Sequence, residues 1–134
     1  MGAYVRVTAE ATLELARRYR DAFFARDVDA IMSLVTPDFV FENVTAGERI
    51  TGADAARRHI ATIHARWPDL RFEERREGIM AGESHAVAEW TAQATHPDTG
   101  RRIKWDGMDL ILVRDGRITR NAVYSSGHAA REIG

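Results

Sequence analysis

The chain has 134 residues, which suits one domain, residues 1–134, with a hydrophobic core of its own. Its formal net charge of -1 argues against a nucleic acid or an anionic membrane as partner, and the absence of cysteine excludes disulfides, thiolate metal sites and cysteine nucleophiles. No apolar run reaches transmembrane length and the first residues lack the apolar region of a signal peptide, so we expect a cytoplasmic protein.

Helical patterns occupy much of the first half of the chain. Thr8 is a suitable N-cap for a long helix over residues 9–26, and Asp27 for a short helix that Pro37 stops. The segment Thr51-Gly52-Ala53-Asp54 matches a capping box, which predicts a third helix that ends at Pro68. Apolar residues at helical spacing predict the three buried faces: Leu15, Tyr19, Ala22 and Phe23; Val28, Ile31, Met32 and Val35; Ala56, Ile60, Ile63 and Trp67.

Strand patterns dominate the second half. A first strand over residues 39–43 lies among the helices, and strands over residues 70–80 and 85–96 follow Pro68. Residues 101–124 predict a hairpin with a tight turn at Arg114-Asp115-Gly116. Alternation along its first strand gives two faces: Ile103, Trp105, Asp109 and Ile111 on one, and Met108, Leu110 and Leu112 on the other. This order predicts an α+β domain in which three N-terminal helices pack on one face of a curved antiparallel sheet.

Asp109 is a carboxyl group placed among large apolar side chains. Because burial disfavours the charged form, its pKa should be raised unless a cation lies beside it. Carboxyl groups of this kind are common at functional sites, but structural hydrogen-bond networks also perturb the pKa. Asp109 is therefore either a catalytic group or a buried carboxyl that holds its strand in register.

The order of these motifs resembles the ketosteroid isomerase and SnoaL-like branch of the nuclear-transport-factor-2-like superfamily. The resemblance covers residues 10–125 and rests on Tyr19 and on three segments: DVDAIMSLVTPDFVFEN, ITGADAARRHI and GMDLILVRDGRITRNAVY. It implies a cone-shaped, cystatin-like domain, with a strongly bent sheet around the helices and a deep apolar cavity. It also implies homodimers through the outer face of the sheet, which would cover Met108, Leu110 and Leu112.

Three residues correspond to functional positions of the isomerases that the chain resembles. Tyr19 falls where they keep an oxyanion-hole tyrosine, and Asp109 where they keep a protonated oxyanion-hole aspartic acid. Asn43 falls where they keep the catalytic aspartate base, and an amide cannot accept the proton. The resemblance therefore implies that the groups stabilising an enolate are present, whereas the expected base is missing.

Two residues are candidates for the missing proton carrier. His96 ends its strand, and the SnoaL-like cyclases that the chain resembles pair a histidine with an aspartate near this place. Glu89 shares a strand face with Val87, Thr91 and Gln93, opposite Ala88, Trp90, Ala92 and Ala94. If this polar row faces the cavity, Glu89 is the leading base; if it faces solvent or a dimer interface, Glu89 is only a pairing residue. His96 is alternatively a solvated loop histidine, and Asn43 a residue that ends its strand in a turn.

These observations predict an enzyme that acts on an apolar, carbonyl-bearing small molecule by enolate-type acid/base chemistry, as an isomerase, aldol cyclase or dehydratase. Phe41, Asn43, Trp105, Val123 and Ser125 are expected to contact the substrate. The sequence has no HExxH, Walker or GxGxxG motif, and His59 and His64 do not share a helix face, so we expect neither a cofactor nor a metal. The alternative is a non-catalytic domain that binds a small molecule in the same cavity.

Overall fold

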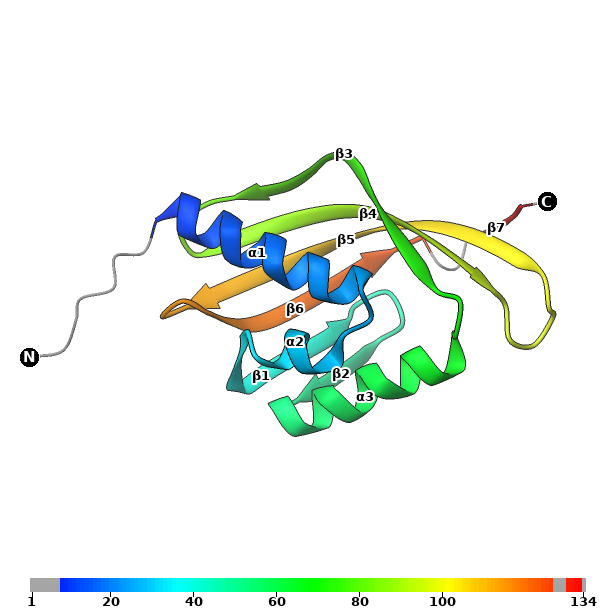
Figure 1. Ribbon diagram of the computed structural model, residues 1–134, viewed down its shortest axis with the longest axis horizontal. Coiled ribbons are helices and arrows are strands. Elements are labelled where there is room, and N and C mark those ends of the chain that lie inside the picture. The colour runs from blue at the N-terminus through cyan, green and yellow to red at the C-terminus, as the bar shows by residue number, and fades with distance from the viewer. Residues whose placement is uncertain (1–7, 127–129, 134) are drawn as a thin grey trace, which may run out of the picture.

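The computed structural model describes residues 8–126 and 130–133, so the expectation about a leader segment in residues 1–7 lies outside the described part of the chain. This part holds three helices and seven strands (Figure 1). The helices are α1 (Ala9–Phe24), α2 (Val28–Met32) and α3 (Ala53–Arg66). The strands are β1 (Val35–Asn43), β2 (Glu48–Thr51), β3 (Arg71–Ala81), β4 (His85–Thr95), β5 (Arg102–Arg114), β6 (Arg117–Ser125) and β7 (Arg131–Glu132). The longest helix, α1, has 16 residues, and no helix of the described ranges is long and apolar enough to span a bilayer.

The strands form one curved sheet in the order β2-β1-β6-β5-β4-β3, with the short β7 also paired to β5. Neighbouring strands are antiparallel except β1 and β6, which run parallel. The expected sheet was wholly antiparallel, and the structure corrects this to a mixed sheet. The reason is that β1 does not pair with the strand that follows α3 but with β6, near the other end of the chain.

The hairpin of β5 and β6 confirms the strongest turn prediction. Asp115 and Gly116 both have positive φ angles, 52° and 74°, as a two-residue type I′ turn requires. Aspartate tolerates this left-handed conformation better than most residues, and glycine adopts it without strain. The alternation is also as predicted, because Trp105 and Asp109 face the interior of the curved sheet whereas Met108 is exposed on the outer face.

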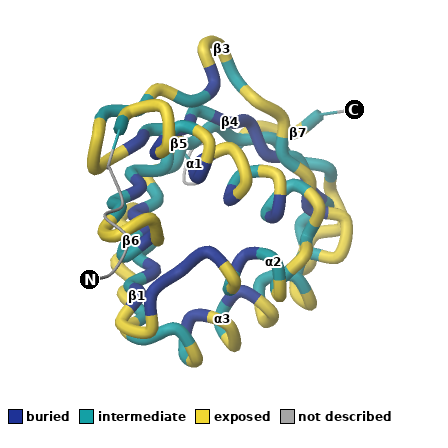
Figure 2. Tube along the Cα trace, turned by 60° about the vertical axis from the view of Figure 1, so that its left-hand side comes forward, coloured by how far each residue is buried: buried dark blue, intermediate teal, exposed yellow. Residues whose placement is uncertain are grey.

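The helices cover the concave face of this sheet. Thr8 and Asp27 cap α1 and α2 as predicted, since their side chains accept hydrogen bonds from Ala11 N and Ala30 N at 3.0 Å. Buried positions of α1 and α3 face each other across the interior (Figure 2). The core joins residues of α1, α2, α3, β1, β4, β5 and β6, so one apolar layer lies between the helices and the sheet.

Three boundaries differ from the sequence prediction. Thr51 does not cap α3 but ends β2, a strand that the sequence did not indicate; Gly52, with φ of 97°, precedes the helix without a side-chain cap. Helix α1 ends at Phe24, two residues earlier than predicted. Val35 belongs to β1 and not to the face of α2, because β1 begins before Pro37 and pairs there with Ile118.

Candidate active site

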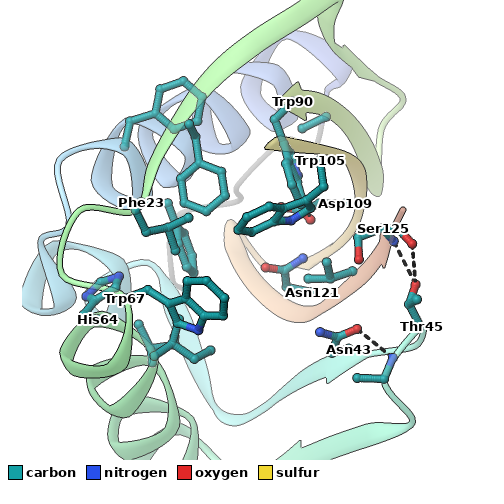
Figure 3. A pocket seen from close by; sticks show the side chains of 18 of the residues that line it. Phe23, Asn43, Thr45, His64, Trp67, Trp90, Trp105, Asp109, Asn121 and Ser125 are labelled. Carbon is teal, nitrogen blue, oxygen red and sulfur yellow. Dashed lines mark hydrogen bonds between the residues drawn. The ribbon is translucent and has the colours of Figure 1, made fainter. Parts of the chain in front are cut away.

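A cavity of about 730 Å3 opens between the helices and the concave face of the sheet (Figure 3). Its wall is mostly aromatic and aliphatic, with side chains from α1, α3 and strands β1 and β3–β6. All five residues that the sequence predicted as substrate contacts lie in this wall: Phe41, Asn43, Trp105, Val123 and Ser125. Their contact with a substrate remains a prediction.

Asp109 lies deep in this cavity and accepts a hydrogen bond from the indole of Trp90. Trp90 Nε1 is 3.1 Å from Asp109 Oδ1. The indole can reach Asp109 because the residue opposite Trp90 on β5 is Gly107. A Cβ atom at position 107 would overlap the Trp90 ring, so glycine leaves the space in which the ring lies.

Burial sets the ionisation of Asp109. It raises the pKa of this carboxyl from 3.8 to about 7, against the opposing effects of the Trp90 hydrogen bond and the Asn121 amide, which lower it. A group with a pKa near neutrality is populated in both protonation states, which is the property that acid/base catalysis needs. The raised pKa predicted from the apolar strand is thus what the structure gives.

Tyr19 donates its hydroxyl proton to Asn121 and not to Asp109. Tyr19 Oη is 2.8 Å from Asn121 Oδ1, and both residues are almost completely buried. Burial, and after it the nearby charge of Asp109, raise the pKa of the Tyr19 hydroxyl well above its ordinary value of 10.0. Tyr19, Asn121, Asp109 and Trp90 therefore form one polar group in an otherwise apolar floor. Within it the Tyr19 hydroxyl already has an acceptor, which corrects the expectation that it points at a substrate oxygen.

The Asn121 amide nitrogen faces this group without a partner of its own. The Asn121 amide lowers the pKa of Asp109, so it lies close to that carboxyl. Its Nδ2 atom nevertheless makes no hydrogen bond of normal geometry to any described residue. Sequence reasoning missed Asn121. The signal was available, because inward-facing Val123 on the same strand puts Asn121, two residues earlier, on the same face.

Asn43 and Ser125 provide further polar atoms at one side of the cavity (Figure 3). Asn43 Oδ1 accepts a hydrogen bond from Ala46 N at 3.0 Å, so the amide closes the turn after β1, as the alternative interpretation of this residue expected. Asn43 and Asp109 both pair with Val123, from opposite sides of β6. Two strand spacings separate them, about 10 Å between Cα atoms.

Glu89 borders the cavity, but its carboxylate is directed away from the cavity interior, which speaks against it as a base beside Asp109. Its neighbours Ala88 and Trp90 point inward, so the Glu89 side chain lies on the convex face. There its Oε2 pairs with Arg75 at 3.3 Å. The concave face of a sharply bent sheet favours the small residues Ala88, Ala92 and Ala94, and the polar row lies outside.

His96 lies in the cavity wall but not beside Asp109. Its ring packs edge-on against Trp67, 5.5 Å between centroids, and its Nδ1 accepts from Asp98 N at 3.1 Å. Ala88 is the residue opposite Asp109, and His96 directly follows the end of β4, eight residues further along the chain, about 26 Å for a straight strand. The structure therefore does not bring His96 beside Asp109, and of the two interpretations of this residue it favours the loop histidine.

Arg26 fixes the aromatic wall that includes Trp67. Its guanidinium donates to the carbonyl oxygens of His64 at 2.8 Å and of Trp67 and Leu70 at 3.1 Å, where the end of α3 leaves these acceptors free. The Trp67 ring in turn packs against the Trp105 ring, with 5.8 Å between the ring centroids. Burial, and after it the Arg26 charge, lower the pKa of His64, which also lines the cavity. No three His, Asp or Glu side chains of the described ranges gather as a metal site would require.

Residues 16–121 match the SnoaL-like domain. The chain belongs to this family. The match spans the chain from the middle of α1 to β6, and so includes every residue of the buried polar group on the cavity floor. The resemblance drawn from the sequence is thereby confirmed.

Solved structures with this fold include several SnoaL-like and isomerase-like proteins. A candidate ketosteroid isomerase from Kribbella flavida DSM 17836 is 24% identical, with a TM-score of 0.70 over 90% of this chain and 82% of the other. A candidate SnoaL-like polyketide cyclase from Jannaschia sp. CCS1 is 14% identical, with a TM-score of 0.79 over 96% and 94%. TerC, co-crystallised with polyporic acid, is 19% identical, with a TM-score of 0.76 over 89% and 94%. These likenesses establish the fold. Among curated proteins, none is significantly similar in sequence.

Proposed function

We propose that this SnoaL-like protein is a cofactor-independent enzyme that moves a proton within an apolar, carbonyl-bearing small molecule. The observation that carries the proposal is Asp109, a half-buried carboxyl on the floor of a mostly apolar cavity, with its pKa raised to about 7. Near neutral pH this group is present both as a base and as an acid. Isomerisation, intramolecular aldol cyclisation and dehydration all need such a group beside a carbonyl.

The surroundings of Asp109 favour the role of proton carrier over that of a permanently neutral hydrogen-bond donor. The Trp90 N–H donates to its Oδ1, and the Asn121 amide lies beside it. Both groups stabilise the ionised carboxylate, which can only accept hydrogen bonds. A base at Asp109 also makes the missing carboxylate at Asn43 unnecessary.

The proposed reaction begins with proton transfer from the substrate to Asp109. The Asp109 carboxylate takes a proton from the carbon next to the substrate carbonyl, and the C–H electron pair becomes the carbon–carbon double bond of an enolate. The carbonyl oxygen then carries the negative charge. Asp109, now neutral, returns the proton to another carbon in an isomerisation; in an aldol closure the enolate carbon attacks a second carbonyl, and the proton goes to the new alkoxide. The apolar wall keeps water from the enolate.

A second candidate function is ligand binding without catalysis. Glu89 faces away from the cavity interior and His96 lies far along β4, so neither brings a second proton carrier to Asp109. A protein of this fold, TerC, has been co-crystallised with a small molecule, polyporic acid. Binding alone would use the same cavity and leave Asp109 as a buried structural carboxyl.

Exchange with heavy water separates the two candidates. An enolisable bicyclic ketone, 2-tetralone, is incubated with the protein in D2O, and deuterium at the carbon beside the carbonyl is followed by NMR. The enzyme proposal predicts exchange faster than buffer, loss of the excess in Asp109→Asn, and a rate that rises with pH to a plateau above about pH 7. Tight binding of the ketone without any excess exchange would support the binding function instead.

We also propose that the protein forms a homodimer through the convex face of the sheet. Met108 and Tyr124 are 41% and 43% exposed there, and they are cross-strand neighbours on β5 and β6. Leu110 and Leu112 continue the same face. An apolar surface on adjacent strands is typical of an interface between copies of a chain.

A further inference from the structure

Asn121 is an unusual residue for the interior of this sheet. It is 1% exposed and lies in the cavity wall, and its oxygen is occupied by the Tyr19 hydroxyl at 2.8 Å. Its Nδ2 group is buried and makes no hydrogen bond of normal geometry to the described residues, although the amide lies close enough to Asp109 to lower the pKa of that carboxyl. A buried donor without an acceptor destabilises the folded state, so a donor kept in this position calls for an explanation.

We propose that Asn121 Nδ2 donates a hydrogen bond to the oxygen of a ligand bound beside Asp109, and that Tyr19 is a positioning residue that holds the amide in this orientation. The inference rests on the proposed function for the identity of the oxygen, a substrate carbonyl that becomes an enolate. It assigns the oxyanion contact to Asn121, in place of the Tyr19 hydroxyl.

The strand register places Asn121 where such a contact is needed. Asp109 pairs with Val123 and Ile111 pairs with Asn121, so Asp109 and Asn121 are diagonal neighbours on the concave face. Diagonal neighbours across an antiparallel pair are about 7–8 Å apart at their Cα atoms. Both side chains line the cavity beside each other, so one functional group of a ligand can contact both. Its oxygen would meet the amide, and the hydrogen on its neighbouring carbon would meet the carboxyl.

Tyr19 explains why the amide points its nitrogen towards Asp109. The phenol donates to Asn121 Oδ1, which turns Nδ2 the other way, towards Asp109. The pKa of Tyr19 is raised well above 10.0, so the phenol stays a donor at every pH at which the protein would work. The other nearby donor, Trp90 Nε1, is already used by Asp109. The ligand class is therefore an apolar skeleton with a hydrogen-bond-accepting oxygen next to an acidic C–H bond.

A matched pair of inert probes tests this donor separately from catalysis. 9-Fluorenone and fluorene share one ring skeleton, but only fluorenone has an acceptor oxygen, and it has no hydrogen on the carbons next to its carbonyl. At pH 9, where Asp109 is ionised and cannot donate, the wild type should bind fluorenone about fivefold more tightly than fluorene, as expected for one net hydrogen bond. Asn121→Leu should reduce this ratio to about one while keeping its affinity for fluorene. Tyr19→Phe should lower the ratio in part, because the amide is then free to turn.

The infrared carbonyl band of bound fluorenone gives a second measurement of this hydrogen bond, independent of affinity. A hydrogen bond from Asn121 should move this band to lower frequency in the wild type than in an apolar solvent. It should return towards the solvent value in Asn121→Leu. An unshifted band in the wild type at pH 9, or a ratio left at its wild-type value in Asn121→Leu, would overturn the inference. If the 2-tetralone exchange fails while the fluorenone results hold, the proposed proton transfer is wrong and the donor assignment stands.

Discussion

Replacing Asp109 by asparagine removes one ionisable group from the cavity floor and leaves a side chain of nearly the same shape. In the wild type, burial raises the pKa of Asp109 from 3.8 to about 7. Unfolding returns the pKa to its ordinary value, so between about pH 4 and pH 7 the folded state holds a proton that the unfolded state has released. The stability of the wild type therefore falls as pH rises through this window.

The size of the effect follows from the two pKa values. Each pH unit between them changes the free energy of unfolding by up to about 1.4 kcal/mol, and the interval spans roughly three units. The wild type should lose about 4 kcal/mol from this group between pH 4 and pH 8. Asp109→Asn lacks this loss, so it should be the more stable of the two proteins at neutral and alkaline pH.

Urea unfolding of both proteins across this pH range measures the difference directly, because titrations of other groups cancel in the comparison. Asp115→Asn is the matched control: Asp115 is exposed in the hairpin turn, and asparagine tolerates its left-handed conformation. The free energy of unfolding of this control should change with pH in parallel with that of the wild type. Stability curves of Asp109→Asn that also run parallel to the wild type would show that Asp109 is not buried as a neutral acid.

Four further substitutions test other parts of the structure. Gly107→Ala should push the Trp90 ring away from Asp109 and so remove a hydrogen bond that lowers the pKa of Asp109. The midpoint of the pH–rate profile should then move to higher pH, and Trp90→Phe should move this midpoint in the same direction. Unchanged midpoints in both variants would contradict the role of the indole. Asn43→Asp keeps an acceptor for the turn and adds a second carboxylate to the cavity. Because Asp109 already supplies the base, isomerisation of a β,γ-unsaturated ketone measured by ultraviolet absorbance should change by less than about tenfold. A rise of about 10²–10⁴-fold would show that the base is missing in the wild type and would contradict the role of Asp109. Leu110→Glu should convert a dimer into a folded monomer by light scattering, and a wild type that is already monomeric would remove the dimer proposal.

The parts of the fold that follow from local chemistry were predictable from the sequence. The Asp115-Gly116 turn, the Thr8 and Asp27 caps and the alternation around Asp109 each depend on a few neighbouring residues. The parallel pairing of β1 with β6 depends on residues far apart in the chain, and no local pattern encodes it. The capping-box prediction at Thr51 failed for a related reason, because pairing with Val40 places Thr51 in a strand.

In the site, too, some residues could be predicted from local sequence and others could not. A carboxyl among apolar residues was enough to indicate Asp109, because desolvation acts wherever such a group is buried. Asn121 stands between Arg120 and Ala122, where a polar residue looks ordinary until the direction of its face is known. The role of Glu89 depended on which face of β4 is concave. Only the bend of the sheet decides that, and it turns the alanine row inward.

The pairing of β1 with β6 also governs when the cavity can form during synthesis. Asn43 leaves the ribosome on the order of 70 residues before Arg117, and until then β1 has only the short β2 beside it, a two-stranded ribbon that is marginal in water. Closing so long a loop carries an entropic cost that must be met before the pair contributes stability, which slows folding. A nascent chain that stops before Arg117 lacks the strand that carries Asn121 and Val123. The cavity is therefore completed late, when β6 joins two parts of the chain made much earlier.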